Sequence, residues 1–372
     1  MTSAHDTLPD EVAGWVGETR YPETANFPVE RGYVWTSCAS VENGNPLFWD
    51  DRVADELTGG PIAPPTTLSL WFRPHAWEPG EVSQRLPLQV HFDLKERLAL
   101  PEAVMTESEV VLAEPVRPGD VISTAQVLRS VSPPKPTKLG TGRFWVIDVE
   151  YRNQDGTLVG IEIFTGFGYV RRGGREALPP PAPPSDSPFP NSHRRDDTAG
   201  WLTVDDVSPG EVLAPLDHRV TATTVVLGAL ATRDWRPMHH DVDFAVNRNG
   251  AKDIFLNTPN QQAWFERYLT DWSGPRGRLG RLRFRMRESV YPGDTMRLAG
   301  TVTAVTRDEG NCGWVDLDLS LQAASGPPNG DDGPADASGA GWRTCTTGHA
   351  RIALPTPEIP NPWTLGSDSW NP

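Results

Sequence analysis

Apolar residues recur at helical spacing in the second half of the chain. They follow an i, i+1, i+4, i+5, i+8 pattern that places them on one helix face: Trp264, Phe265, Tyr268, Leu269 and Trp272. Thr258 and Pro259 suit the N-cap and first position of this helix, and Gly274 suits the position just past its end. The pattern predicts a helix over 258–272 whose apolar face belongs to the core.

Alternation of apolar and polar positions predicts strands in both halves of the chain. In each half a Pro-Gly-Asp turn, at 118–120 and 292–294, precedes the alternating sequence. The predicted strands span 121–131, 143–153, 157–170, 295–306, 313–323 and 342–353. A helical pattern covers 28–41, and a second apolar helical stretch runs through Leu68 and Phe72. Residues 1–25 are polar and are expected to be partly loose.

The same order of loop, helix and strands occurs twice, on either side of a proline-rich stretch. The run Leu178-Pro179-Pro180-Pro181-Ala182-Pro183-Pro184 cannot pack as a helix or a central strand and predicts an extended linker. We therefore expect an α+β fold with an N-terminal unit at 26–172, a linker at 173–200 and a C-terminal unit at 201–356. The Gly-, Pro- and Asp-rich segment 326–341 predicts a loop in the second unit.

Composition and charge exclude several classes of protein. The chain has 372 residues, 37% hydrophobic residues and 14 tryptophans, enough for ordered cores. Its net charge of −15 argues against nucleic acid and anionic membrane surfaces as partners. The three cysteines match no metal-ligand spacing and fit a reducing compartment. No metal is therefore expected. The sequence shows no apolar leader and no membrane span, so a soluble, cytoplasmic protein is expected.

Two acids and two histidines surround Pro237 in the stretch 234–245. Carboxylate and imidazole groups transfer protons near neutral pH. Pro237 favours a loop before it, so Asp234 and His239 are expected to flank a bend and to point into one cavity. Asp241 suits the N-cap of a short helix ending near Gly250. For Asp234 and His239, the alternative is a purely structural role as polar residues at a helix entrance. For Asp241, helix capping is the favoured role.

This stretch resembles the hydration motif of the MaoC-like hotdog dehydratases, the family of the (R)-specific enoyl-CoA hydratases. The motif D-x-N-P-x-H-x-D, followed by a small residue, is matched by Asp234, Pro237, His239, Asp241 and Ala245, whereas Arg236 replaces the usual Asn. The resemblance implies a double hotdog, in which each half is a curled antiparallel sheet wrapped around a long helix. It also implies a reversible enoyl-CoA hydratase, a hydro-lyase with Asp234 and His239 as catalytic residues and with coenzyme A only as part of the substrate.

Four segments are similar to the actinobacterial hydratases of steroid side-chain enoyl-CoA thioesters, namely 231–234, 239–241, 253–255 and 270–275. This resemblance implies a bulky acyl-CoA substrate, and it implies a homodimer or a complex with another acyl-CoA-processing subunit. A hotdog thioesterase and a non-catalytic acyl-CoA-binding subunit are the alternatives. Thioesterases of this fold usually place their acid on the central helix, which argues against the first alternative. Intact Asp234 and His239 argue against the second.

The first half carries a degenerate copy of the motif. With Pro46 aligned to Pro237, Asn43 takes the place of Asp234, Phe48 that of His239 and Asp50 that of Asp241. Neither Asn nor Phe titrates near neutral pH, so one reactive site per chain is expected.

Three more sets of residues are candidates for binding. The backbone N–H groups of Leu256 and Asn257, before the long helix, are candidates for holding the enolate oxygen. Alternating arginines on one strand face are candidates for coenzyme A phosphates, with a solvated outer face as the alternative: Arg281, Arg283 and Arg285. Large side chains of the first half are candidates for an acyl pocket: Phe48, Trp49, Trp71 and Phe72.

Overall fold

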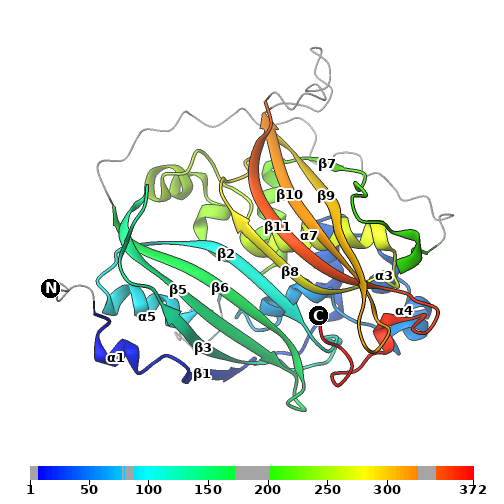
Figure 1. Ribbon diagram of the computed structural model, residues 1–372. Coiled ribbons are helices and arrows are strands. Elements are labelled where there is room, and N and C mark those ends of the chain that lie inside the picture. The colour runs from blue at the N-terminus through cyan, green and yellow to red at the C-terminus, as the bar shows by residue number, and fades with distance from the viewer. Residues whose placement is uncertain (1–6, 78, 80–87, 172–200, 326–340) are drawn as a thin grey trace.

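The computed structural model describes residues 7–77, 79, 88–171, 201–325 and 341–372. Over these residues the strands form one eleven-stranded sheet with antiparallel neighbours, curved and covered by helices (Figure 1). The first-half strands are β1 (Thr19–Thr24), β2 (Glu102–Leu112), β3 (Ser123–Val131), β4 (Lys135–Pro136), β5 (Gly140–Arg152) and β6 (Leu158–Arg171). The second-half strands are β7 (Leu216–Arg219), β8 (Arg278–Met286), β9 (Asp294–Arg307), β10 (Gly313–Ser325) and β11 (Arg343–Leu354).

Helices of several kinds connect these strands. In the first half they are α1 (Asp10–Ala13), α2 (Arg31–Ser40), α3 (Pro46–Trp49), α4 (Asp51–Thr58), the 3-10 helix η1 (Pro65–Trp71) and α5 (Gln89–Arg97). In the second half they are η2 (Val204–Asp206), α6 (Ala222–Ala231), the 3-10 helix η3 (Pro237–His239), the π-helix η4 (Phe244–Asn249), α7 (Thr258–Ser273) and η5 (Pro362–Thr364).

The two halves repeat one strand order. The first half runs β1-β3-β5-β6-β2 and the second β7-β9-β10-β11-β8 in the reverse direction along the sheet, with β2 and β8 paired at the centre. Glu109 lies opposite Arg283 and Val110 opposite Leu282 in this central pair. The internal repeat that the sequence predicts is therefore present in the topology, and the two halves meet edge to edge. Pairing of β2 with β8 covers the edge that either half would otherwise expose.

The central helices of the two halves differ. α7 has 16 residues, whereas its first-half counterpart η1 has seven and is a 3-10 helix. Pro64 offers η1 no side-chain cap, and Pro74 follows closely and disfavours helical backbone at Arg73. The expectation of a long helix holds for the second half and is wrong for the first, because prolines stand on both sides of η1.

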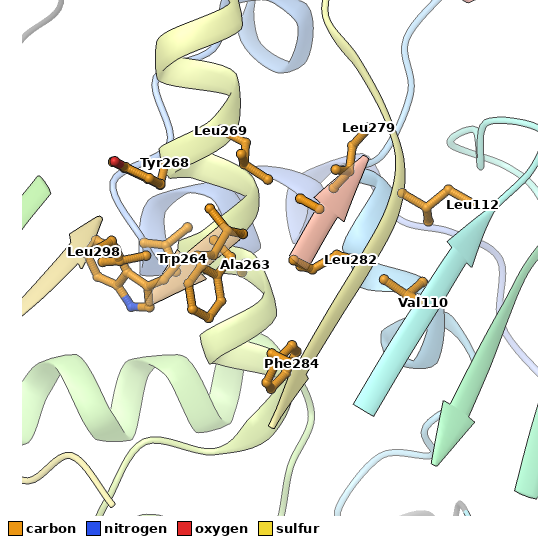
Figure 2. Close-up of a cluster of buried hydrophobic side chains, with 14 of the residues drawn as sticks. Val110, Leu112, Ala263, Trp264, Tyr268, Leu269, Leu279, Leu282, Phe284 and Leu298 are labelled. Carbon is orange, nitrogen blue, oxygen red and sulfur yellow. The ribbon is translucent and has the colours of Figure 1, made fainter. Parts of the chain in front are cut away.

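One large apolar cluster contains residues of both halves. Figure 2 shows Leu269 of α7, Leu282 of β8 and Val110 of β2 in this cluster. Trp264 and Phe265 of α7 are fully buried, so the apolar face predicted for this helix is confirmed as core. The repeated halves therefore share a core across the central strand pair.

Most element predictions are confirmed, with bounds shifted by a few residues. Asn257 caps α7 instead of Thr258, since its side chain accepts from the Asn260 N–H. The expectation that residues 1–25 are partly loose is wrong for Thr19–Thr24, which pair with β3 as an edge strand of polar sequence. The predicted linker 173–200 lies outside the described residues, as does the predicted loop except Gly341. The domain boundaries therefore stay a prediction.

Candidate functional site

The motif loop lies between α6 and η3 and has a tight backbone path. Arg233 adopts a positive φ of 48°, which turns the chain after α6. The side chain of Asp234 accepts from the Arg236 N–H at 3.4 Å, and Pro237 begins η3. Downstream, Asp241 Oδ1 accepts from the Phe244 N–H at 3.0 Å, and Gly250 ends the π-helix with φ 74°. The predicted loop, cap and helix end are all confirmed.

Asp234 and His239 face each other across this bend. Asp234 Oδ2 and His239 Nε2 are 3.8 Å apart, and the residues are only 8% and 7% exposed. This separation is too long for a direct hydrogen bond. It allows a single water oxygen to lie within hydrogen-bond distance of both atoms. The structure thus brings together the two residues that the motif spacing predicts.

Asp234 is held as a carboxylate by neighbours from several elements. Asn257 Nδ2 donates to its Oδ2 at 3.0 Å, and Arg73 Nη1 lies 3.7 Å from the same oxygen. Burial raises the pKa of Asp234, but Arg73, His239 and Asn257 outweigh burial and leave this pKa below its ordinary value. Asp234 is therefore ionised at neutral pH.

His239 has a defined tautomer. Its Nδ1 donates to the Phe255 carbonyl at 2.8 Å, because a carbonyl oxygen can only accept. The Phe255 ring packs edge-on against the imidazole, with the centroids 4.9 Å apart. Burial lowers the pKa of His239, and the opposing attraction of Asp234 does not cancel the effect. The imidazole is therefore neutral at pH 7, with the lone pair of Nε2 on the side of Asp234.

The two oxyanion candidates have different environments. The Leu256 N–H already donates to the Val290 carbonyl at 3.1 Å. The expectation that this N–H holds the enolate oxygen is therefore wrong. The backbone N–H of Asn257 stays a candidate. The Asn257 side chain caps α7 through Oδ1 and donates through Nδ2 to Asp234 and to Thr232. Sequence reasoning missed this role, although an Asn before a Thr-Pro helix start is a recognisable capping signal.

The four acyl-pocket candidates do not form one surface. Phe48 and Trp71 are 5% and 1% exposed and belong to the main apolar core, and Phe72 packs against it. Trp49 is 45% exposed and stacks on Trp35 at the surface. The structure therefore does not bring these four side chains together as one acyl pocket, because they lie in different environments.

The candidate arginines lie on the outer face of β8. Phe284 between them packs against Phe265 of α7, so alternation turns Arg283 and Arg285 away from that helix. Both bind Glu107 of β2, at 2.7 and 2.8 Å, and Arg281 lies 3.5 Å from Glu109. Cross-strand glutamates therefore balance these charges, and the solvated-face alternative agrees better with the structure than phosphate binding does.

The first half keeps the loop geometry of the motif without its titratable groups. Asn43 Oδ1 accepts from the Asn45 N–H at 3.0 Å, as Asp234 accepts from Arg236. Glu42 has a positive φ of 53°, matching Arg233. Phe48, in the place of His239, is buried. The degenerate copy is therefore a structural repeat that lacks a proton-transferring pair.

Within the described residues, no group of three or more His, Cys, Asp or Glu residues is arranged to hold a metal ion. No described helix is long and apolar enough to cross a membrane.

Comparisons with known proteins find relatives over parts of the chain. A family model described as "FAS1-like, dehydratase domain region" matches residues 15–161. The chain is 42% identical over 96 residues to the 3-oxo-4,17-pregnadiene-20-carboxyl-CoA hydratase beta subunit of Mycobacterium tuberculosis, covering 26% of this chain and 74% of that protein. It is 29% identical over 153 residues to a probable enoyl-CoA hydratase alpha subunit of Thermomonospora curvata, covering 39% of this chain and 46% of that protein.

Solved structures share the fold over most of the chain. A MaoC-like dehydratase matches with a TM-score of 0.62 and 16% identity, covering 92% of this chain and 99% of that one. A Mycobacterium tuberculosis protein described as a double hotdog matches with a TM-score of 0.58 and 14% identity, covering 91% and 96%. These likenesses show the double hotdog fold, and the sequence relationships show the family. The chain therefore belongs to the MaoC-like hotdog dehydratases, hydro-lyases of the enoyl-CoA hydratase type.

Proposed function

We propose that this chain adds water across the α,β double bond of a bulky acyl-CoA thioester of the steroid side-chain type, and catalyses the reverse dehydration. The observation that carries the proposal is the buried pair Asp234 and His239, 3.8 Å apart, with a carboxylate on one side and a neutral Nε2 on the other. Both groups accept protons at neutral pH, as activation of a water molecule requires.

The pair supports one balanced reaction. A water molecule held between Asp234 Oδ2 and His239 Nε2 loses a proton to Nε2 while its oxygen adds to the β-carbon. The same pair then returns a proton to the α-carbon, so both residues regain their starting states and one water has been added. General acid–base assistance of this kind contributes about 10²–10⁴ in rate.

The N-terminus of α7 is the part of the site suited to the negative charge that develops on the thioester oxygen. Asn257, its N-cap, touches Asp234, so the positive end of the helix lies beside the reacting pair. The backbone N–H of Asn257 is the donor that we assign to this oxygen, and one such donor contributes about 3–4 kcal/mol to the transition state.

The substrate class and the assembly rest on the relatives. The mycobacterial relative is named for a pregnadiene carboxyl-CoA, and both relatives are named as subunits. These names support a bulky ring-bearing acyl-CoA substrate. We propose no cofactor beyond the coenzyme A of the substrate. The names also support a complex with another acyl-CoA-processing chain, and a homodimer is the alternative assembly.

An absorbance assay that follows loss of the enoyl-thioester double bond tests the proposal. The purified chain is offered four-carbon, long linear and ring-bearing enoyl-CoA substrates, and turnover is expected to be highest with the ring-bearing thioesters. Release of free coenzyme A, measured with a thiol reagent, would instead identify a thioesterase. Preference for the four-carbon thioester would contradict the assigned substrate class.

A further inference from the structure

A residue of the first half reaches the reacting pair in the second half. Arg73 follows η1, and its Nη1 lies 3.7 Å from Asp234 Oδ2. This oxygen is the one that faces His239 Nε2 and accepts from Asn257 Nδ2. Arg73 and Asp234 are largely buried, with side chains only 15% and 10% exposed, so solvent screens their attraction weakly.

A second contact fixes the segment that carries Arg73. The Trp235 indole N–H donates to the Pro74 carbonyl at 2.8 Å. Two neighbouring residues of the motif loop, Asp234 and Trp235, therefore contact two neighbouring residues of the first half, Arg73 and Pro74. The guanidinium is therefore placed by the backbone on both sides of the contact, and not by its own flexible side chain alone.

Arg73 differs from the structural arginines of the molecule in what it binds. Arg278 donates to the backbone carbonyls of Pro362, Leu365 and Ala113. By contrast, the Nε of Arg73 is buried without a hydrogen-bond partner among the residues that the structure describes. What sets Arg73 apart is that the carboxylate it faces is Asp234, whose ionised form its positive charge favours.

The internal repeat supplies a matched arginine with no catalytic neighbour. Arg267 follows Pro259 at the same distance along the chain as Arg73 follows Pro65. It also crosses to the other half, where its Nη1 donates to the Val41 carbonyl at 2.8 Å, beside the degenerate motif. Both arginines thus bridge the halves, but only Arg73 meets the proton-transferring pair.

We propose that Arg73 is a positioning residue of the active site: it holds Asp234 ionised and oriented toward His239, so that the working site is built from both halves of the chain. The other charged or titratable groups that face this contact are Arg236 and His239 beside Asp234, and Glu162 and Tyr151 beside Arg73. As far as it concerns catalysis, this inference rests on the proposed hydratase function.

The pH profile of hydration separates a positioning role from a structural one. In Arg73→Gln, the charge that favours both the Asp234 carboxylate and the neutral His239 imidazole is gone. The acid limb of kcat should therefore move to higher pH, and kcat should fall about tenfold or more. Arg73→Lys keeps the charge and should leave the acid limb in place, with a smaller fall in kcat because the fork geometry is lost. Arg267→Gln is the matched control; it should lower the melting temperature without moving the acid limb.

An acid limb that stays in place in Arg73→Gln, or moves equally in Arg267→Gln, would overturn the proposal. Should the Gln variant fail to fold, the Lys variant decides: a displaced acid limb in a folded Arg73→Lys protein also overturns it.

A titration without substrate keeps this inference separate from the proposed reaction. The His239 ring signal is identified by NMR through its loss in His239→Ala and is followed with pH in the full-length chain. Removal of the nearby positive charge in Arg73→Gln should raise the pKa of His239, whatever reaction the chain catalyses. An unchanged titration would show that Arg73 does not act on the pair. If the pKa of His239 rises in Arg73→Gln but the wild-type chain hydrates no enoyl-CoA, the proposed function is rejected. The electrostatic effect of Arg73 on the pair is then still supported.

Discussion

Three side chains converge on a single oxygen at the centre of the site. Asp234 Oδ2 lies near His239 from η3, Asn257 from the start of α7 and Arg73 from the end of η1. Arg73 and Asn257 favour the ionised carboxylate, as does His239 once its imidazole is protonated, and together they offset the penalty of burial. This arrangement makes the protonation state of the pair a property of several elements rather than of the motif alone.

Removal of either member of the pair should abolish most hydration. Asp234→Asn and His239→Ala are each expected to lower kcat by at least about a hundredfold, with smaller effects on binding of the thioester. Steady-state kinetics and the affinity for a non-reactive acyl-CoA analogue measure the two effects. Near wild-type turnover in either variant would contradict the assignment of the pair.

The pH dependence of the wild-type reaction should reflect His239. Because burial lowers the pKa of His239, its imidazole stays neutral at pH values below the ordinary histidine pKa. Wild-type kcat/KM should therefore fall only as pH drops through that lowered pKa.

Asn257 links the cap of α7 to the carboxylate. Asn257→Ala removes the acceptor for the Asn260 N–H and the donor to Asp234, so stability should fall by about 1 kcal/mol and kcat should fall as well. Asn45→Ala is a matched control, since Asn45 caps α3 in the degenerate copy through the Leu47 N–H. The control should lose stability with kcat unchanged. Equal losses of kcat in both variants would contradict a specific role for Asn257.

At the scale of elements, α7 supplies a side-chain cap to the N-terminus of η1, which has none from its own N-cap residue. Glu266 in α7 is fully buried, and its Oε2 accepts from the Thr66 N–H at 2.8 Å, in the first turn of η1. Burial raises the pKa of Glu266 to about 7, against an ordinary value of 4.5, although the Thr66 contacts oppose the rise. The junction between the central helices therefore contains a carboxyl group that is protonated in mildly acidic solution.

This carboxyl predicts a pH-dependent stability. Between its ordinary pKa and about 7, the folded chain keeps a proton that the unfolded chain has released, so stability falls as pH rises through this window. Glu266→Gln retains an acceptor for Thr66 and removes the titration, so its stability should decline less between about pH 5 and about pH 8. Denaturant unfolding at both pH values measures the difference, with exposed Glu56→Gln as the control. Parallel declines in wild type and Glu266→Gln would contradict the role of this group.

At the scale of the whole molecule, the halves are joined by more than the central strand pair. Arg233 binds Glu30 at 2.6 Å across the halves, and Arg267 binds the Val41 carbonyl. The C-terminal segment adds a further link: the Trp370 indole donates to the Leu112 carbonyl of β2, and Arg278 lies over the Trp370 ring. Contacts of this number across one interface indicate that the halves fold as partners.

A fragment of residues 201–372 should therefore not replace the whole chain. It lacks β2, so it exposes the β8 edge and the apolar side chains that face Val110 and Leu112. It also lacks Arg73. We expect this fragment to aggregate or to show less than about a hundredth of wild-type kcat, and expect co-expression with residues 1–200 to restore part of the activity. Size-exclusion chromatography and the hydration assay test both points, and a soluble fragment with full kcat would refute this account of the first half.

The sequence alone determined the features that depend on near neighbours. Alternation predicted the strands β3, β5, β6, β9, β10 and β11, and the apolar stripe predicted α7. The spacing of Asp234, Pro237 and His239 predicted that the acid and the imidazole lie close together, because one proline-led turn brings both side chains to the same side. The loss of this pair in the first half, at Asn43 and Phe48, was equally readable from the alignment of the two copies.

Only the tertiary structure decided which surfaces these elements share. The Arg73 contact with Asp234 and the burial of Phe48 and Trp71 depend on how the two halves meet. Alternation shows that Arg283 and Arg285 share a face, but it does not say that Glu107 of β2 lies opposite them. These partners come from distant parts of the chain, and a periodic pattern along one segment carries no information about which other segment will cover it.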